Sequence, residues 1–191
     1  MISDGELILR LQSGSLHALG ELYDRHQHMV YRTALAVTGD EAAAADLLQD
    51  VFLRMHRFAD RIDSNRPLEP WLYRATTNLT YTYVKRRKRW LQPLEDMAEW
   101  LTVGKKQSPS YLAEKDEEWQ DIHQAITGLP LSQRMVVVLY YINDLSLQEI
   151  SEVLDVPVGT VKSRLYYGRK ALKTELESNG LDLREVQCEF T

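Results

Sequence analysis

Cysteine is nearly absent from this chain, and so is any long uninterrupted run of apolar residues. The 191 residues include one cysteine, Cys188, so neither an internal disulfide nor a thiolate metal site is expected. No apolar stretch approaches the length that a helix needs to cross a bilayer, and the first residues lack the basic and then apolar order of a signal peptide. We therefore expect a protein that stays in the cytoplasm and does not insert into a membrane.

The signatures of common enzyme classes are missing as well. The five histidines include no pair spaced four residues apart, and there is neither a glycine-rich phosphate loop nor a nucleophile elbow. His26 and His28 are two residues apart, and on a helix such residues face away from each other. We therefore expect no catalytic activity, no metal and no cofactor.

Positive charge is scarce overall but concentrated in two segments. A formal net charge of −5 argues against binding to nucleic acid, because such binding is driven by Lys and Arg displacing counterions from phosphates. Segment 61–91, however, is rich in Lys and Arg and contains only two acids, Asp63 and Glu69, while segment 157–174 is basic and contains none. Two basic regions in an acidic chain indicate two local surfaces for an anionic partner.

Apolar residues recur at helical spacing almost throughout, and the alternation typical of strands is absent. This pattern predicts an all-α protein with two small helical domains joined by a linker, the second containing a helix-turn-helix. We expect helices at about 4–12, 15–38, 41–58 and 68–90, and then at 110–127, 132–143, 146–154 and 159–178. The predicted division is a first domain at 1–91, a linker at 92–110 that could extend to about 60 Å, a second domain at 111–178 and a tail at 179–191.

The second domain contains the pattern of a helix-turn-helix. Ser146 and Glu149 fit a capping box that starts a short helix, and a tight turn near Asp155 leads to a basic second helix. Asp155 tolerates left-handed backbone angles better than most residues, so it does not exclude a tight turn at this position. A merely solvated amphipathic helix is the alternative interpretation, but the combination favours DNA. The residues we expect to reach the major groove are Thr160, Lys162, Ser163, Arg164, Tyr167 and Lys170.

The helix at 41–58 has one apolar face, and its opposite face combines acids with a single leucine. On that face lie Leu53 and its polar neighbours. A lone exposed leucine needs no explanation, yet an apolar anchor inside a polar rim is also the usual anatomy of a protein interface. Helical geometry alone leaves these two interpretations equal. The face consists of Asp46, Gln49, Asp50, Leu53 and Arg57.

The helix at 68–90 is also two-sided. Its outer stripe combines cations for phosphates, an amide able to bond a base, and an aromatic ring on which an unpaired base could stack. Trp71 lies at the border and fits the edge of the core better than the stripe. The basic run at 85–89, taken alone, would equally suit a solvated helix end. The stripe consists of Arg74, Asn78, Tyr81, Lys85 and Lys88.

Taken together, these motifs resemble those of a known family. Asp46–Phe52 is similar to sigma region 2.2, and Pro70–Arg74 with Asn78–Leu79 and the basic run is similar to regions 2.3 and 2.4. The stretch from Leu129–Pro130 and Gln133–Arg134 through Ser146–Ile150 to Val156–Leu165 resembles sigma region 4. The compact arrangement resembles the extracytoplasmic-function (ECF) branch of the bacterial sigma factors.

This resemblance implies a function and partners. It implies a sigma factor that directs core RNA polymerase to promoters, docks on the beta-prime clamp helices through the face containing Leu53, and binds the beta flap through the second domain. It implies minus-35 duplex readout, minus-10 strand capture with a base held in the loop at 61–69, and control by an anti-sigma protein. Thr77 and Thr82 depart from the family pattern and leave the preferred minus-10 sequence open. The implied minus-10 residues are Arg61, Asn65, Arg66, Arg74, Asn78, Tyr81, Lys85, Arg86, Lys88 and Arg89.

A helix-turn-helix regulator with a ligand-sensing or dimerising first domain is the main alternative. It accounts for residues 129–175 equally well, but not for the acidic face of the third helix or the basic stripe of the fourth. A regulator should bind duplex DNA alone, whereas a sigma factor should bind promoters well only together with core polymerase.

Overall fold

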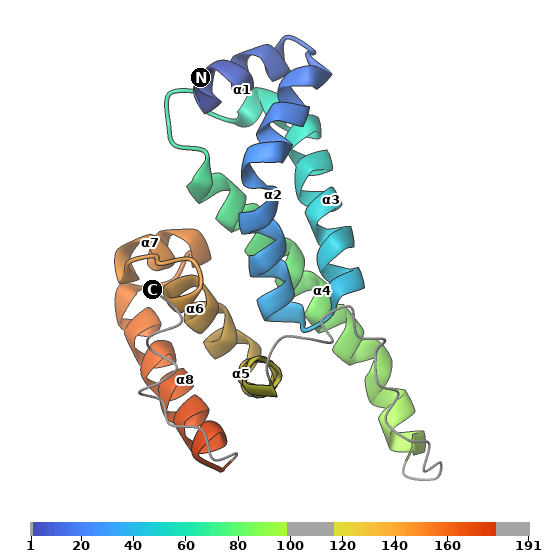
Figure 1. The fold of residues 1–191 in the computed structure, drawn as a ribbon, viewed down its shortest axis with the longest axis vertical. Helices are drawn as coiled ribbons and strands as arrows, with labels where there is room; N and C mark the ends of the chain where they lie inside the picture. The colour runs from blue at the N-terminus through green and yellow to red at the C-terminus, as the bar shows by residue number, and fades with distance from the viewer. Residues whose placement is uncertain (1, 99–116, 179–191) are drawn as a thin grey trace.

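The computed structural model describes residues 2–98 and 117–178, and within these ranges the protein is helical throughout (Figure 1). This confirms the predicted all-α class with two helical units. None of the helices in the described ranges is long and apolar enough to cross a membrane. The first unit contains α1 (Asp4–Gln12), α2 (Leu16–Thr38), α3 (Glu41–Arg57), a 3-10 turn η1 (Ala59–Arg61) and α4 (Glu69–Ala98). The second contains α5 (Glu117–Gly128), α6 (Leu131–Tyr141), α7 (Leu147–Leu154) and α8 (Val158–Ser178).

Side-chain caps determine where several helices begin. The hydroxyl of Ser15 accepts a hydrogen bond from the amide of Ala18 at the start of α2, and the carboxylate of Asp40 accepts from Ala43 at the start of α3. Such caps satisfy amides that have no partner inside the helix. At the other end of α2, Gly39 has φ 69°, a left-handed conformation that glycine adopts without steric cost. The predicted starts of both helices thus lie within one residue of the observed ones.

Helix boundaries differ from prediction in two places. Helix α4 was expected to end near residue 90, but it continues across Pro93 to Ala98. Proline removes one backbone donor and strains a helix without having to end it. The turn η1 was not predicted, because three residues are too short to show a period. The remainder of the expected linker, together with the tail at 179–191 and Cys188, lies outside the described residues.

The core of the first unit forms where α1, α3 and α4 pack on α2. Leu7, Leu22, Val51 and Leu72, one from each of these four helices, are fully buried in a single apolar cluster. Tyr23 and Phe52 meet edge to face with ring centroids 4.9 Å apart. Burial of side chains of this size contributes about 1.5–3 kcal/mol each, so this cluster holds the first four helices together.

The second unit packs against the first instead of standing apart from it. Figure 1 shows α5 and α6 beside the C-terminal half of α2, and α7 beside α4. Ala36 and Val37 of α2 share one buried cluster with Ile122, Ile126 and Met135. A methyl group added at Gly39, the residue that ends α2, would lie only 2.7 Å from Thr127 Cγ2 of α5. The structure is therefore a closed arrangement with a continuous apolar contact between its two units.

Polar contacts reinforce this closed arrangement. Thr33 and Asn143 bond each other through their side chains, with Asn143 Nδ2 donating to Thr33 Oγ1 at 2.9 Å. Arg134 of α6 donates from Nη1 to the carbonyl of Val37 at 2.6 Å, and from Nη2 to the carbonyls of Thr127 and Leu129. One guanidinium thus caps the C-terminal ends of α2 and α5, where the helix dipoles favour a cation.

Candidate polymerase and nucleic-acid interfaces

The outer face of α3 is exposed along its whole length. Asp46, Gln49, Asp50 and Arg57 are all exposed, and Leu53 has 63% of its surface accessible. On the opposite side, Ala44, Leu48, Val51 and Met55 are buried, as expected from the apolar face, whereas Phe58, the fifth residue expected there, is half-buried. Leu47 and Phe52 are buried as well. The structure therefore brings the predicted polymerase-binding residues together on one free face, with an apolar side chain among carboxylates.

The start of α3 is tied to the basic end of α4. Arg87 Nη1 lies 2.7 Å from the Asp40 carboxylate that caps α3. The amide of Ala43 and, after it, the Arg87 guanidinium hold the pKa of Asp40 below its usual range, although burial acts in the opposite direction. Arg87 thus has a structural partner that the other cations of the run do not share, which sequence reasoning did not anticipate.

The outer stripe of α4 is exposed, as predicted from the helical period. Asn78, Tyr81, Lys85 and Lys88 are all exposed, and so are Arg86 and Arg89. Lys85 Nζ lies 4.7 Å from the centroid of the Tyr81 ring. A cation over an aromatic face is favourable, and it also places positive charge next to the ring on which a base would stack. Four buried or half-buried apolar residues, Leu72, Ala75, Leu79 and Tyr83, form the inner side of this helix.

Arg74, the first cation of that stripe, is engaged by the second unit. Its guanidinium donates to the carbonyl of Glu152 in α7. Its neighbour Tyr73 packs in the apolar cluster between α6, α7 and α8, and burial there raises the pKa of the Tyr73 hydroxyl, with a hydrogen bond to Asn143 acting in the opposite direction. In the closed arrangement Arg74 therefore faces α7, whereas the rest of the stripe faces solvent.

The loop between α3 and α4 has buried ends and an exposed tip. Ile62 and Leu68 are 5% and 1% exposed, whereas Asn65 and Arg66 are exposed at the tip. Asp63 organises this tip, since its carboxylate accepts from the Asn65 amide at 3.0 Å and lies 3.2 Å from Arg66 Nε. Upstream, the guanidinium of Arg61 lies 5.2 Å from the Phe58 ring. The three predicted loop residues, Arg61, Asn65 and Arg66, are thus exposed on one short ordered loop.

Helices α7 and α8 form the predicted helix-turn-helix. The capping box is complete: Ser146 Oγ accepts from the Glu149 amide, and the Glu149 carboxylate accepts from the Ser146 amide at 2.8 Å. The Ser146 hydroxyl, as the larger cause, and the Ser146 amide both hydrogen-bond the Glu149 carboxylate and lower the pKa of Glu149. Asp155 ends α7 with φ 52°, a left-handed conformation that aspartate was expected to tolerate. The two helices therefore begin and end where their local sequence predicts.

The predicted recognition residues of α8 divide by exposure. Lys162, Ser163, Tyr167 and Lys170 are exposed, while Thr160 and Arg164 are half-buried. On the opposite face Val161, Leu165 and Gly168 are buried against the rest of the unit. Tyr166, which is absent from the predicted set, is 63% exposed and meets Tyr167 edge to face at 5.3 Å. The exposed side of α8 is therefore both basic and aromatic.

An apolar groove of about 1450 Å³ runs between α5, α6 and α8 and reaches the start of α7. Its rim is largely basic, with Asp144 and Glu149 at one end. Sequence reasoning did not predict it, because a groove depends on how helices pack and not on any local pattern. Its lining includes Ile126, Val137, Tyr141, Leu165, Leu172 and Leu176 and, at the rim, Lys162, Arg169, Lys170 and Lys173.

Two of the histidines make polar contacts with another helix. His26 Nε2 lies 2.6 Å from the Asp4 carboxylate, and His123 Nε2 lies 3.3 Å from the carbonyl of Leu35. Residues 2–98 and 117–178 contain no group of three or more His, Cys, Asp or Glu side chains arranged to hold a metal ion.

Comparison with known proteins identifies both units. The family described as sigma-70 region 2 matches residues 22–90, and the family described as sigma-70 region 4 matches residues 119–172. The chain is 34% identical over 176 residues to the ECF RNA polymerase sigma factor SigW of Bacillus subtilis (strain 168), a match that covers 88% of this chain and 94% of that protein.

Solved structures agree on the fold. CnrH, in complex with the cytosolic domain of CnrY, has a TM-score of 0.67 at 25% identity and covers 92% of this chain and 97% of its own. The sigma factor RpoE from Bartonella quintana, in complex with the anti-sigma factor NepR, has a TM-score of 0.65 at 21% identity and covers 83% and 96%. The chain belongs to the ECF branch of the sigma-70 family of RNA polymerase sigma factors.

Proposed function

We propose that this sigma factor recruits core RNA polymerase through α3, reads the minus-35 element as duplex through α8, and captures the opened minus-10 strand through α4 and the preceding loop. The observation that carries this proposal is the presence of three separate exposed surfaces, one acidic with an apolar anchor and two basic with aromatic side chains, on one sigma-family chain. The protein acts in the cytoplasm, has no cofactor and is not an enzyme.

The polymerase-docking surface is the outer face of α3. Leu53 has 63% of its surface exposed, and the carboxylates of Asp46 and Asp50 lie on the same face of α3. An apolar anchor inside a polar rim is the usual composition of a protein interface, and the charges would steer it toward a basic partner. The partner we propose is the pair of beta-prime clamp helices, with Gln49 and Arg57 contributing polar contacts.

Minus-10 capture uses the α4 stripe and the base-capture loop, by which we mean residues 61–69. Lys85, Lys88 and Arg89 supply cations for phosphates, and Tyr81 supplies a ring on which a base can stack. Stacking on an aromatic side chain contributes about 1–3 kcal/mol per base. Asn65 and Arg66 at the loop tip would select the flipped base, since both carry hydrogen-bond donors in exposed positions.

Minus-35 readout uses the exposed face of α8. Lys162, Ser163 and Tyr167 lie within the first three turns of that helix, the part that reaches base edges in helix-turn-helix proteins. Lys170 and the more distal cations would contact phosphates. Each well-formed contact to a base contributes about 1–3 kcal/mol of discrimination.

The groove between α5, α6 and α8 is our proposed site for the beta flap of the polymerase. Its apolar floor and lysine rim suit an amphipathic partner segment that carries acidic residues at its edges. Control by an anti-sigma protein is part of the same proposal, and the complex of the structurally similar RpoE with NepR supports it.

Promoter binding requires the two units to separate. We propose a first domain at 1–91, a linker at 92–110, a second domain at 111–178 and a tail at 179–191, with the linker setting the distance between the DNA elements. In the closed arrangement one donor of Arg74 is used by the carbonyl of Glu152, so opening would free that donor for a phosphate. Tethering two weak modules raises the effective concentration of the second to about millimolar, which makes affinity depend on element spacing.

The docking assignment is tested with the double variant Asp50→Ala with Leu53→Ala. Its binding to core polymerase should be lost in co-purification, because it lacks both the apolar anchor and a carboxylate of the rim. The matched control is Leu16→Ala with Asp24→Ala, which removes a leucine of similar exposure, 65%, and an exposed acid from α2. Wild-type retention of core polymerase by the α3 variant would refute the assignment.

A further inference from the structure

Helix α1 contacts the base-capture loop and the turn before it. In Figure 1 the turn that follows α3 lies against α1. The side chain of Gln12, at the end of α1, bonds this turn. Gln12 Nε2 donates to the carbonyls of Ala59 and Ile62, both at 3.0 Å. A side-chain amide has two N–H donors, so this one group uses both to hold the two backbone positions at which the loop begins.

A second contact brings α1 against the tip of the loop. A methyl group added at Gly5 would overlap the carbonyl oxygen of Ser64. Ser64 lies between Asp63, which organises the tip, and Asn65, which is exposed there. The first turn of α1 thus approaches the loop backbone as closely as only glycine permits, while the last turn of α1 bonds the base of the loop.

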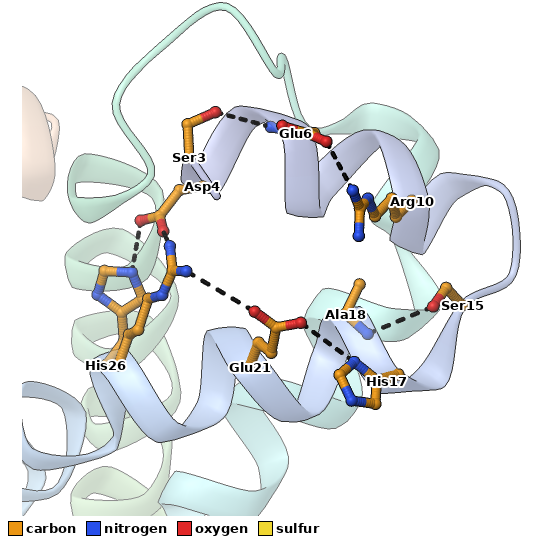
Figure 2. A network of polar contacts seen from close by, with 10 residues as sticks. Ser3, Asp4, Glu6, Arg10, Ser15, His17, Ala18, Glu21 and His26 are labelled. Atoms are coloured by element: carbon orange, nitrogen blue, oxygen red, sulfur yellow. Dashed lines mark hydrogen bonds and ion pairs between the residues drawn. The ribbon is translucent and has the colours of Figure 1, made fainter. Parts of the chain in front are cut away.

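Helix α1 is itself anchored firmly. Figure 2 shows the Asp4 carboxylate directed at α2, where it lies 2.8 Å from Arg25 Nη1 and 2.6 Å from His26 Nε2. Leu7 and Ile8 on the inner face of α1 are completely buried. A buried face and the two polar contacts of Asp4 fix α1 on the core, so α1 is a rigid support for the loop.

We infer that α1 is a positioning element for promoter recognition, in which Gln12 and Gly5 set the conformation of the base-capture loop and thereby its choice of base. This inference rests on the proposed capture of a base by that loop. Neither residue touches DNA in this account. They act by holding the backbone that presents Asn65 and Arg66, because a site selects one base only when its hydrogen-bonding groups are held in a defined geometry.

The test uses the complex of this protein with core polymerase and single-stranded DNA. A minus-10 element is first selected from a promoter library by run-off transcription. Oligonucleotides carrying each of the four bases in turn at every position of that element then give a base preference by competition binding. The variants are Gln12→Leu, which removes both donors at similar size, and Gly5→Ala. The matched control is Arg10→Leu, a change on the same helix at a residue that pairs with Glu6.

We expect Gln12→Leu and Gly5→Ala each to reduce the preference for the favoured base by about tenfold at one position, a loss comparable to that of one good base contact. Binding to core polymerase and to minus-35 duplex should remain at the wild-type level, and Arg10→Leu should behave as wild type. A general loss of fold would weaken binding of all four bases equally, so the ratio separates positioning from stability.

Asn65→Ala and Arg66→Ala distinguish the inference from the function on which it rests. If Asn65→Ala removes the base preference while Gln12→Leu and Gly5→Ala both retain it, positioning by α1 is refuted and base capture stands. If neither Asn65→Ala nor Arg66→Ala changes the preference, the proposed capture by this loop is refuted, and the inference about α1 with it.

Discussion

Replacing Arg134 by Met should be among the most destabilising single changes that leave the apolar core intact. The Arg134 guanidinium donates three hydrogen bonds, to the carbonyls of Val37, Thr127 and Leu129, and it lies where two helices end. Arg134 is half-buried, and this burial lowers the pKa of its guanidinium. A hydrogen bond to a charged group contributes about 1.5–3 kcal/mol, but three bonds from one group share a single desolvation cost and are not additive.

We therefore expect Arg134→Met to lower the free energy of unfolding by about 2–4 kcal/mol. Urea unfolding of the full chain, followed by far-ultraviolet circular dichroism, measures this change. Arg134→Lys should recover less than half of the loss, because one ammonium group lacks the planar fork that reaches carbonyls on two helices.

The matched control is Arg32→Met. Arg32 also contacts the other unit, through the carbonyl of Ile142 at 3.4 Å, but it is exposed and makes this bond at the limit of useful length. Its replacement should cost less than about 0.5 kcal/mol, as for most surface substitutions. Equal stabilities of the Arg134 and Arg32 variants would contradict the view that Arg134 joins the two units.

Four further changes test the packing and the caps. Gly168→Ala should destabilise by about 1–3 kcal/mol, because its methyl group would lie 2.8 Å from Val137 Cγ2, whereas Gly20→Ala, in open space on α2, should stabilise by about 0.5–1 kcal/mol in the same urea assay. Asp155→Gly should raise the free energy of unfolding, measured by thermal denaturation, by about 0.5 kcal/mol, because Asp155 has φ 52° and glycine adopts this left-handed conformation without strain. Because the pKa of Asp40 is lowered, the stabilisation by its carboxylate is present above the ordinary pKa of 3.8 and is lost as the pH falls below that value. The free energy of unfolding of Asp40→Ala should therefore change less with pH in that range than that of the wild type.

The faces and caps of single helices could be predicted from the sequence, because they depend on residues three or four positions apart. The exposed set around Leu53, the stripe through Tyr81 and the box formed by Ser146 and Glu149 all follow from such local patterns. The left-handed turn at Asp155 was also foreseeable, since few residue types tolerate that conformation.

Contacts between distant segments could not be predicted in this way. Nothing near Arg74 in the sequence indicates that its partner is a carbonyl of α7, and nothing near Gln12 indicates that its amide meets the turn after α3. Nothing near Asn143 in the sequence indicates that its side chain bonds Thr33 across the two units. Such contacts depend on how helices are arranged in space, and a single sequence contains no periodic signal for that arrangement.

The central claim is that this protein makes core RNA polymerase specific for promoters. The most direct measurement is run-off transcription from a promoter library with core enzyme alone, with this protein alone and with both together. We predict defined transcripts from a small set of DNA sequences only when both are present. Transcription by the core enzyme that the protein does not change, together with tight binding of duplex DNA by the protein alone, would contradict the account and favour a helix-turn-helix regulator.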